Sequence, residues 1–318
     1  VPLASRRVGI SRPSAARIYL LLAVGVVAAG ILCRDLLPWT FRLPDSWTVP
    51  VAAWVQALFD WLGYSADLGL FTFRDLTRGI AWLLAWPLEW AEALLYSGFP
   101  ALGLAQLPWI ALVLLVTILG HALGGWRLAL LAGGCVFYVA LFGVWRGSMQ
   151  TLSIIVITVP LAAATGLTLG ILAVRSRRVE MVLTGLFDLM QSIPHFAYLV
   201  PVVVLFGFGQ VPAMIATGIF AMPPMARCTI LGLRTVPAEV IESGRMSGCS
   251  PRQLLWKVQL PAARPTLMVG VNQVIMQTLA MAVIASLIGA PGLGFDLLYS
   301  LQNLKLGQAL EQGVAIVV

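Results

Sequence analysis

Two polar side chains, Asp188 and Gln191, stand one helical turn apart at the start of an apolar stretch, 183–206. A carboxylate is costly inside a bilayer, and where one is found there it commonly marks the path of a solute or an ion. The pair therefore predicts a polar contact for a solute that crosses the membrane. The alternative is structural, because Asp188 lies near the expected membrane boundary and can pair with a nearby arginine.

Aromatic and amide side chains on two apolar stretches extend this set of candidates. Phe196 and Tyr198 offer aromatic faces that suit a methylated cation, although ordinary packing explains them equally well. Pro194 and Pro201 are expected to kink the helix that carries them. Amides in 266–289 must face protein or water, and helix packing accounts for them as well as a solute path does. The candidate path residues are Asp188, Gln191, Pro194, Phe196, Tyr198, Asn272 and Gln277.

Motifs for catalysis and for cofactor binding are missing from the sequence. It has no G-x-x-x-x-G-K-[ST] for ATP phosphates, no H-E-x-x-H for zinc and no G-x-S-x-G for a nucleophilic serine. The four cysteines have no C-x-x-C spacing, and the two histidines are too few for a metal cluster. The sequence therefore predicts no catalytic residue, no metal and no cofactor in this chain.

Composition places the chain in a membrane. Of its 318 residues 60% are hydrophobic and 10% are charged, with a mean hydropathy of +0.93, whereas a soluble domain is about one-quarter charged. About 20 apolar residues cross a bilayer, and on that basis we expect about eight spans, the last one truncated where the sequence stops at Val318. The expected spans are 18–33, 107–125, 128–145, 151–174, 183–206, 211–232, 266–289 and one that starts near 307.

Basic residues in short loops set the orientation of a membrane protein. Most of the 20 lysines and arginines fall on one side of the expected spans, and we assign that side to the cytoplasm. The net charge of +7 therefore follows membrane topology and does not indicate a nucleic-acid partner. The residues on this side are Arg6, Arg7, Arg12, Arg17, Arg127, Arg175, Arg177, Arg178, Arg227, Arg234, Arg245, Arg252, Lys257 and Arg264.

Residues 36–106 are expected to stay on the outer side as one unit. Charged residues recur at helical spacing in the stretch FRDLTRGIAWLLAWPLEWAEALL, and its other faces carry Leu, Ile and Trp. This pattern predicts an amphipathic helix in the membrane interface, with Trp at headgroup depth. The alternative is a ninth span over 79–98, which would require another crossing within 34–78, where no stretch is long enough.

Residues 237–260 carry dense signals for a folded, water-exposed unit between two spans. Pro237 suits the start of a helix, and Gly248 can end that helix in a left-handed conformation. Ser250-Pro251 then supplies the N-cap and the first position of a second helix. Leu260-Pro261 is expected to close it, because proline blocks continuation. On these grounds alone, a folded loop and a docking unit are equally good interpretations.

The spacing in this unit resembles the EAA motif of ABC importer permeases, which reads EAA, three residues, G, nine residues, I-x-L-P. The two alanines appear here as Ser243 and Gly244, and the isoleucine as Val258. In that family the short helix docks on a cytoplasmic ATPase and transmits its motion to the membrane helices. The resemblance implies that ATPase coupling involves Glu242, Ser243, Gly244, Arg245, Gly248, Ser250, Pro251, Leu260 and Pro261.

Residues 150–318 are more widely similar to the permease subunits of glycine betaine/proline-type ABC importers, for example in GVNQVIMQTLAMAVIASLIGAPGLG. The resemblance implies an all-α, multi-pass protein of the bacterial inner membrane with a type I importer core. We expect a tail and first helix over 1–35, an interfacial segment over 36–106 and the permease core over 107–318. The resemblance places a glycine-rich turn near the external gate or the binding protein, and its residues are Gly289, Pro291, Gly292 and Gly294.

The resemblance also implies a set of partners. Two permease copies bind two cytoplasmic ATPase subunits, which hold ATP and Mg²⁺, and receive substrate from a separate binding protein outside the membrane. The implied substrates are small methylated amines: glycine betaine, choline, carnitine, proline betaine or trimethylamine N-oxide. Alternatives are an importer for amino acids or sulfonates and, more remotely, a membrane scaffold or enzyme. An importer of chelated metals is disfavoured because the chain lacks a Cys/His cluster.

Overall fold

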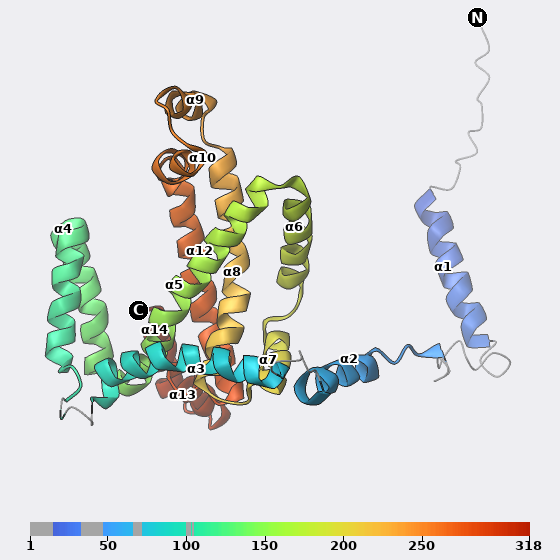
Figure 1. Ribbon diagram of the computed structural model, residues 1–318. Helices are drawn as coiled ribbons and strands as arrows, with labels where there is room; N and C mark the ends of the chain where they lie inside the picture. The colour runs from blue at the N-terminus through green and yellow to red at the C-terminus, as the bar shows by residue number, and fades with distance from the viewer. Residues whose placement is uncertain (1–14, 33–46, 66–71, 100–102, 104) are drawn as a thin grey trace, which may run out of the picture. The chain divides into compact units, whose positions relative to one another are not determined.

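The computed structural model describes residues 15–32, 47–65, 72–99, 103 and 105–318. These residues form helices joined by short turns, and no β-strand occurs among them (Figure 1). The backbone divides into two compact units, Val1–Leu58 and Phe59–Val318. The expected all-α class is therefore confirmed for the described part of the chain.

The first unit contains α1 (Ala15–Leu32) and most of α2 (Val51–Asp60), which is followed by one π-helical turn, η3 (Trp61–Ser65). The apolar part of α1, Arg17–Ile31, matches the first expected span but is shorter than the other membrane-length helices. The predicted cytoplasmic tail with Arg6, Arg7 and Arg12 lies outside the described residues.

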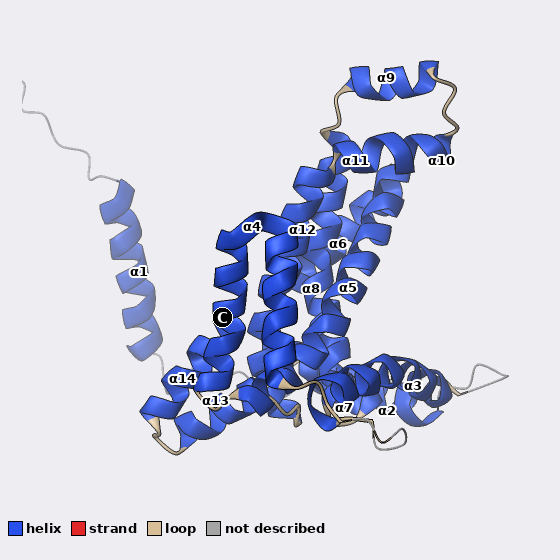
Figure 2. Cartoon of the chain, turned by 90° about the vertical axis from the view of Figure 1, so that its left-hand side faces the viewer, coloured by secondary structure: helices blue, strands red, loops and turns tan. Residues whose placement is uncertain are grey.

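Three long helices form the centre of the second unit: α5 (Trp145–Arg175), α8 (Gln210–Arg234) and α12 (Arg264–Ala285). They pack against one another along their lengths (Figures 1 and 2). Glycines allow the close approach: a Cβ at Gly170 of α5 would lie 2.4 Å from Thr229 Cβ of α8, and a Cβ at Gly270 of α12 would lie 2.8 Å from Met225 Sδ. The larger side chains around these contacts form a buried core that joins all three helices.

The stretch α4 (Trp109–Leu141) is a helical hairpin (Figure 2). Its backbone leaves helical geometry at Gly124 (φ −148°, ψ 15°) and Gly125 (φ 74°, ψ −168°), and the second of these conformations favours glycine. The arms pack closely, because a Cβ at Gly120 would lie 3.0 Å from Ala129 Cα. The expected spans 107–125 and 128–145 are thus the two arms. Each arm is about 22–24 Å long at 1.5 Å per residue, which is shorter than a typical hydrocarbon core of about 30 Å.

The expected continuous span over 183–206 is wrong, because the chain turns sharply inside it. Helix α6 (Arg177–Ser192) is followed by a 3₁₀ turn, η6 (His195–Tyr198), and then by α7 (Leu199–Phe206), and the two halves are bent by 113°. Ile193 is extended (φ −77°, ψ 133°), as expected for a residue that precedes a proline. The predicted kink at Pro194 is therefore a complete break.

Among the described residues, four helices are long and apolar enough to cross a membrane, and a fifth span results if the bent pair counts as one. The four are α5, α8, the stretch Arg264–Ile288 and α4, whose length is that of its two hairpin arms together. Beyond them the chain forms a 3₁₀ turn, η8 (Ser286–Ile288), and two short helices, α13 (Leu293–Gln302) and α14 (Leu306–Val317). A multi-pass membrane protein is confirmed, with hairpin arms and a broken helix where longer straight spans were expected.

Helix α3 (Phe73–Glu92), extended by a π-helical turn, η4 (Ala93–Ser97), runs across one end of the central helices (Figure 1). A capping box between Thr72 and Asp75 begins it, and hydrogen bonds from Thr72 lower the pKa of the Asp75 carboxyl. Leu88 is buried in the core cluster, whereas the side chains of Trp82 and Trp86 are exposed. This transverse course favours the interfacial interpretation of 79–98, which stays a prediction.

Candidate functional site: a coupling unit and its attachment to the core

A pair of short helices, the coupling unit (residues 237–263), lies at the end of the central helices opposite α3 and α13 (Figures 1 and 2). Its first helix is α9 (Ala238–Met246). The second helical stretch is made of α10 (Pro251–Gln253), a π-helical segment η7 (Leu254–Gln259) and α11 (Leu260–Ala262). The unit connects the end of α8 to the start of α12.

Local sequence signals build the corner of the coupling unit as expected. Gly248 has φ +76°, and its N–H donates to Arg245 O at 2.9 Å, which ends α9 in the left-handed conformation. Ser250 caps the next helix in a capping box with Gln253: the Ser250 N–H donates to Gln253 Oε1 at 2.9 Å. Pro251 follows at the first helical position. Pro237, expected to open α9, is its N-cap residue.

The predicted stop at Leu260-Pro261 is wrong. The helical backbone continues through both residues and bends only at Ala263 (φ −79°, ψ −5°), after which α12 starts at Arg264. The π-helical segment explains this difference: the Leu260 N–H donates to Leu255 O, five residues back. A π-bulge changes the register of the hydrogen bonds ahead of a proline that cannot donate one.

Gly244 lies where the two helices of the coupling unit cross. A Cβ there would lie 2.8 Å from Leu254 Cδ1 and 3.1 Å from Val258 Cγ2. The glycine that replaces the second alanine of the EAA pattern therefore lets the two helices approach more closely than an alanine would allow.

The coupling unit has one buried and one exposed face. Leu254 and Leu255 are buried, whereas Met246 is 90% exposed and Trp256 is 62% exposed. The charged and polar residues of the motif, Glu242 and Arg245 among them, are also exposed. The exposed face therefore offers both apolar and charged side chains to its surroundings.

Apolar contacts attach the buried face to the membrane helices. Leu255 belongs to the same buried cluster as Leu233 of α8 and Leu267 of α12, and Ile241 and Leu260 pack against that cluster. This shared cluster ties the coupling unit to both α8 and α12.

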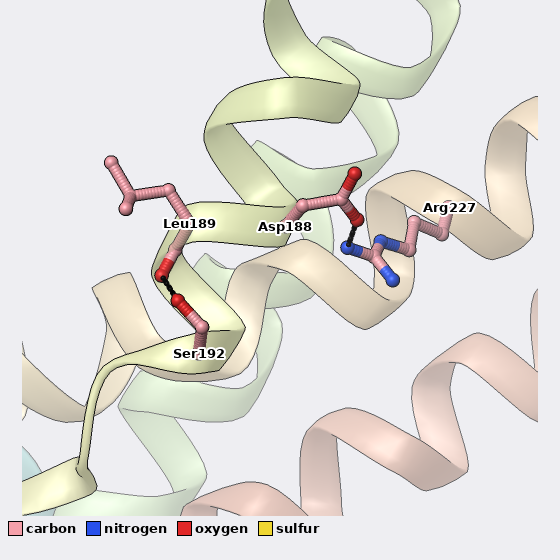
Figure 3. A network of polar contacts seen from close by, with 4 residues as sticks. All are labelled: Asp188, Leu189, Ser192 and Arg227. Atoms are coloured by element: carbon pink, nitrogen blue, oxygen red, sulfur yellow. Dashed lines mark hydrogen bonds and ion pairs between the residues drawn. The ribbon is translucent and has the colours of Figure 1, made fainter. Parts of the chain in front are cut away.

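Two ion pairs fasten α6 to α8. Asp188 Oδ1 lies 2.6 Å from Arg227 Nη2 (Figure 3), and Glu180 pairs with Arg234. The pairing of Asp188 with an arginine is therefore observed, as its structural interpretation required. Arg227 and Arg234 lie on α8, not in a loop as expected, and the position of Arg227 inside an apolar stretch was a signal that could have identified it as the partner.

The other candidate path residues are spread over three elements. Tyr198 and His195 pack their rings against Phe220 of α8, with ring centroids 5.6 and 4.3 Å apart. Phe196 is exposed on η6, Gln191 is exposed on α6, and Pro194 is the N-cap of η6. Asn272 is exposed and Gln277 is half-buried on α12. Packing thus accounts for Tyr198, and a path role for the whole set stays a prediction.

The glycine-rich turn lies at the far end of α12 from the coupling unit. Gly289 (φ +81°) and Gly292 (φ +128°) adopt conformations that favour glycine. A Cβ at Gly294 would lie 2.5 Å from Ala282 O, and the Leu293 N–H donates to Thr151 Oγ1 of α5 at 2.9 Å. Pro291 is half-buried in this turn. The turn therefore fixes α13 against α5 and α12 by close backbone contact.

The described helices thus form a bundle with membrane-length members and an exposed helical pair at one end. The family described as "Binding-protein-dependent transport system inner membrane component" matches residues 164–318. Together with the relatives described next, this match shows that the chain belongs to that family. It is thus an inner membrane component of that family.

The chain is 43% identical over 303 residues to the trimethylamine N-oxide transport system permease protein TmoV of Ruegeria pomeroyi, a match that covers 94% of this chain and 45% of that protein. It is 39% identical over 275 residues to the glycine betaine/proline betaine transport system permease protein ProW of Escherichia coli K12, which covers 85% of this chain and 72% of ProW. The chain therefore spans less than half the length of the TmoV relative.

A solved structure of the MetNI methionine ABC transporter in an inward-facing conformation is also similar. Its matching chain is 22% identical, with a TM-score of 0.49, and the match covers 56% of this chain and 89% of that chain.

Proposed function

We propose that this chain is the permease subunit of an ATP-driven importer for small methylated amines. The activity is supported by one observation above all: the coupling unit exposes Met246 and Trp256 to a partner while its buried Leu255 joins the core of α8 and α12. The substrate class is supported by the relatives, which are named for the transport of trimethylamine N-oxide and of glycine betaine or proline betaine. Choline and carnitine belong to the same chemical class.

The proposed importer needs partners that supply ATP hydrolysis and substrate delivery. A cytoplasmic ATPase, in two copies, holds ATP and Mg²⁺ and contacts the exposed face of the coupling unit. A second copy of the chain completes the translocation path, and a binding protein delivers substrate at the other end. Residues 1–35, 36–106 and 107–318 form the tail with its first helix, the interfacial segment and the permease core.

The proposed path runs beside the bent pair α6–α7. Closure of the ATPases moves the coupling unit, and α8 moves with it because the two share a core. Asp188 on α6 is tied to α8 through Arg227, so the same motion acts on the helix that carries the candidate path residues. The glycine-rich turn at Gly289–Gly294 holds the opposite end of α12 as part of the external gate.

The function is tested by uptake of radiolabelled solutes. The full-length chain is produced with its ATPase and binding protein in cells that lack such importers, and the panel contains glycine betaine, choline, carnitine, trimethylamine N-oxide and proline. We expect ATP-dependent accumulation of at least one methylated amine. A matched strain carries an ATPase that cannot hydrolyse ATP, which separates pumping from leakage.

Uptake of amino acids or sulfonates in place of every methylated amine would keep the importer and overturn the substrate class. Absence of all uptake, with each subunit present in the membrane and the binding protein folded, would overturn the proposed function as a whole.

A further inference from the structure

A cavity of about 300 Å³ lies between the start of α3 and helix α7, at the end of the core away from the coupling unit. One wall is formed by Arg74, Thr77 and Arg78 of α3, and the facing wall by Val203, Val204 and Phe206 of α7. The cavity is thus basic on one side and apolar on the other. It shares no residue with the coupling unit or with the candidate path.

The basic wall concentrates positive charge. Arg74 and Arg78 are four residues apart on α3 and therefore neighbours on one face of the helix, where two like charges repel each other. Arg74 belongs to the first turn, where the helix dipole adds a partial positive charge. Among the described residues, the ion pairs found are those of Arg227 and Arg234, and neither involves α3.

Asp75 is the carboxylate closest in sequence to these arginines, but it is already engaged. Its Oδ2 accepts from the Thr72 hydroxyl at 2.6 Å and from the Thr72 N–H at 3.1 Å in the capping box. Arginine side chains bind phosphate with two parallel hydrogen bonds. Asp75 attracts both arginines through space, but the ion pairs found among the described residues do not include it. A phosphate between Arg74 and Arg78 would therefore add direct hydrogen bonds that Asp75 does not make.

The apolar wall and the surroundings indicate where such a phosphate comes from. Trp82, Trp86 and Trp90 on the same helix are exposed, and exposed tryptophans of this kind lie at the depth of lipid headgroups. An acyl chain beneath the phosphate would contact Val203, Val204 and Phe206 of α7. Free phosphate would make no favourable contact with the apolar wall. A phospholipid would contact the basic wall with its phosphate and the apolar wall with its acyl chain.

We propose that the cavity between α3 and α7 binds the phosphodiester group of a phospholipid, with Arg74 and Arg78 as the phosphate ligands. The bound lipid fills the junction between the transverse helix and the bent pair, and it thereby holds α3 against the end of the core. The site takes its ligand from the leaflet in which α3 lies.

Native mass spectrometry of the full-length chain in complex with its ATPase tests the site by counting retained phospholipids. We expect Arg74→Gln/Arg78→Gln to retain one phospholipid fewer per chain than wild type, with at least a tenfold lower occupancy of that lipid. Arg74→Lys/Arg78→Lys keeps the charge but loses the bidentate geometry. Its lipid occupancy should therefore lie between those of wild type and the double glutamine variant. Arg146→Gln is the matched control, because it removes an exposed arginine at the start of α5, outside the cavity.

A second variant keeps both charges and blocks the space. Ala81 lines the cavity, so Ala81→Leu should lower lipid occupancy without changing the net charge, and it decides the question if the double glutamine variant does not fold. Equal phospholipid counts in wild type, Ala81→Leu and the double glutamine variant would overturn the proposal. Displacement of the lipid by inorganic phosphate in detergent solution would also overturn it, since the site would then belong to the free anion.

Discussion

The two ends of α12 are attached to the rest of the molecule in different ways. At its start, the coupling unit rests on apolar side chains such as Leu255 and Leu267, which belong to one buried cluster. At its far end, the turn at Gly292 and Gly294 approaches neighbouring helices so closely that no side chain fits between them. The difference fits the proposed coupling role, in which one end of α12 receives motion from the ATPase while the other end is held in place as an anchor.

The largest effect is expected at the anchor. Gly294→Val would place a side chain where even a Cβ lies 2.5 Å from Ala282 O and 2.8 Å from Val283 Cα, both of them backbone atoms. Overpacking a core costs about 1–3 kcal/mol where neighbours can adjust, and a helix backbone adjusts least. We expect a loss of about 3 kcal/mol or more, measured as a lower unfolding temperature and less folded protein in the membrane.

Gly313→Ala on α14 is the control for that substitution, because its Cβ would meet nothing within 4 Å. If Gly294→Val unfolds at the same temperature as this control, the far end of α12 is not an anchor.

A smaller loss of stability but a large loss of transport is expected at Gly244. Gly244→Leu would force α9 away from Leu254 and Val258 and cost about 1–3 kcal/mol, while the membrane helices stay folded. We expect substrate uptake to fall at least tenfold, with membrane insertion unchanged. Gly248→Asn is the matched change, since its Cβ meets open space and asparagine tolerates φ +76°; it should retain most of the uptake. Full uptake by Gly244→Leu would contradict the coupling role.

A substitution on the exposed face of the coupling unit should weaken binding of the ATPase and leave the stability of the chain nearly unchanged. Trp256→Ala removes a side chain that is 62% exposed, so the free energy of unfolding should change by no more than about 0.5 kcal/mol. If Trp256 is an anchor for the ATPase, affinity should fall by about 2 kcal/mol, or roughly thirtyfold. Titration of the purified chain with its ATPase measures this, and Trp82→Ala on α3 is the control. An unchanged affinity would show that the ATPase does not contact this face.

The coupling unit was predictable because its signals are local. Gly248 must be left-handed wherever it ends a helix, and Ser250-Pro251 starts the next helix through atoms within three residues. The likeness of residues 242–261 to the EAA motif added the predicted role in ATPase coupling. The continuation of the helix past Pro261 was not predictable in this way, because the π-helical segment that permits it leaves no distinct signature in the sequence.

The bent pair and the ion pairs were only partly predictable, because they depend on contacts between residues far apart in the sequence. Pro194 indicates a kink, but whether the chain bends slightly or by 113° depends on the packing of η6 and α7 against α8 through rings such as Phe220. Hydropathy likewise locates apolar arms on both sides of Gly124 without showing how they pack. The partner of Asp188 lies 39 residues away on another helix. An arginine inside an apolar stretch marks a candidate, but no pattern near Asp188 specifies which arginine it contacts.

A small change in stability, and the sharpest test of the path, is expected at Asp188. Its side chain is 66% exposed in the ion pair with Arg227, and exposed pairs contribute about 0–1 kcal/mol. Asp188→Asn should therefore lower stability slightly, since it leaves Arg227 without its carboxylate partner. The double change Asp188→Asn/Arg227→Gln removes both charges and should recover that loss.

Uptake separates the two interpretations of this ion pair. If Asp188 only fastens α6 to α8, the double variant should transport like wild type, and so should Glu180→Gln/Arg234→Gln, which neutralises the other ion pair between the same helices. If Asp188 contacts the solute, the double variant at Asp188 and Arg227 stays impaired while the one at Glu180 and Arg234 does not. Because both double variants remove one ion pair between α6 and α8, a difference in uptake between them measures what Asp188 does beyond holding the two helices together.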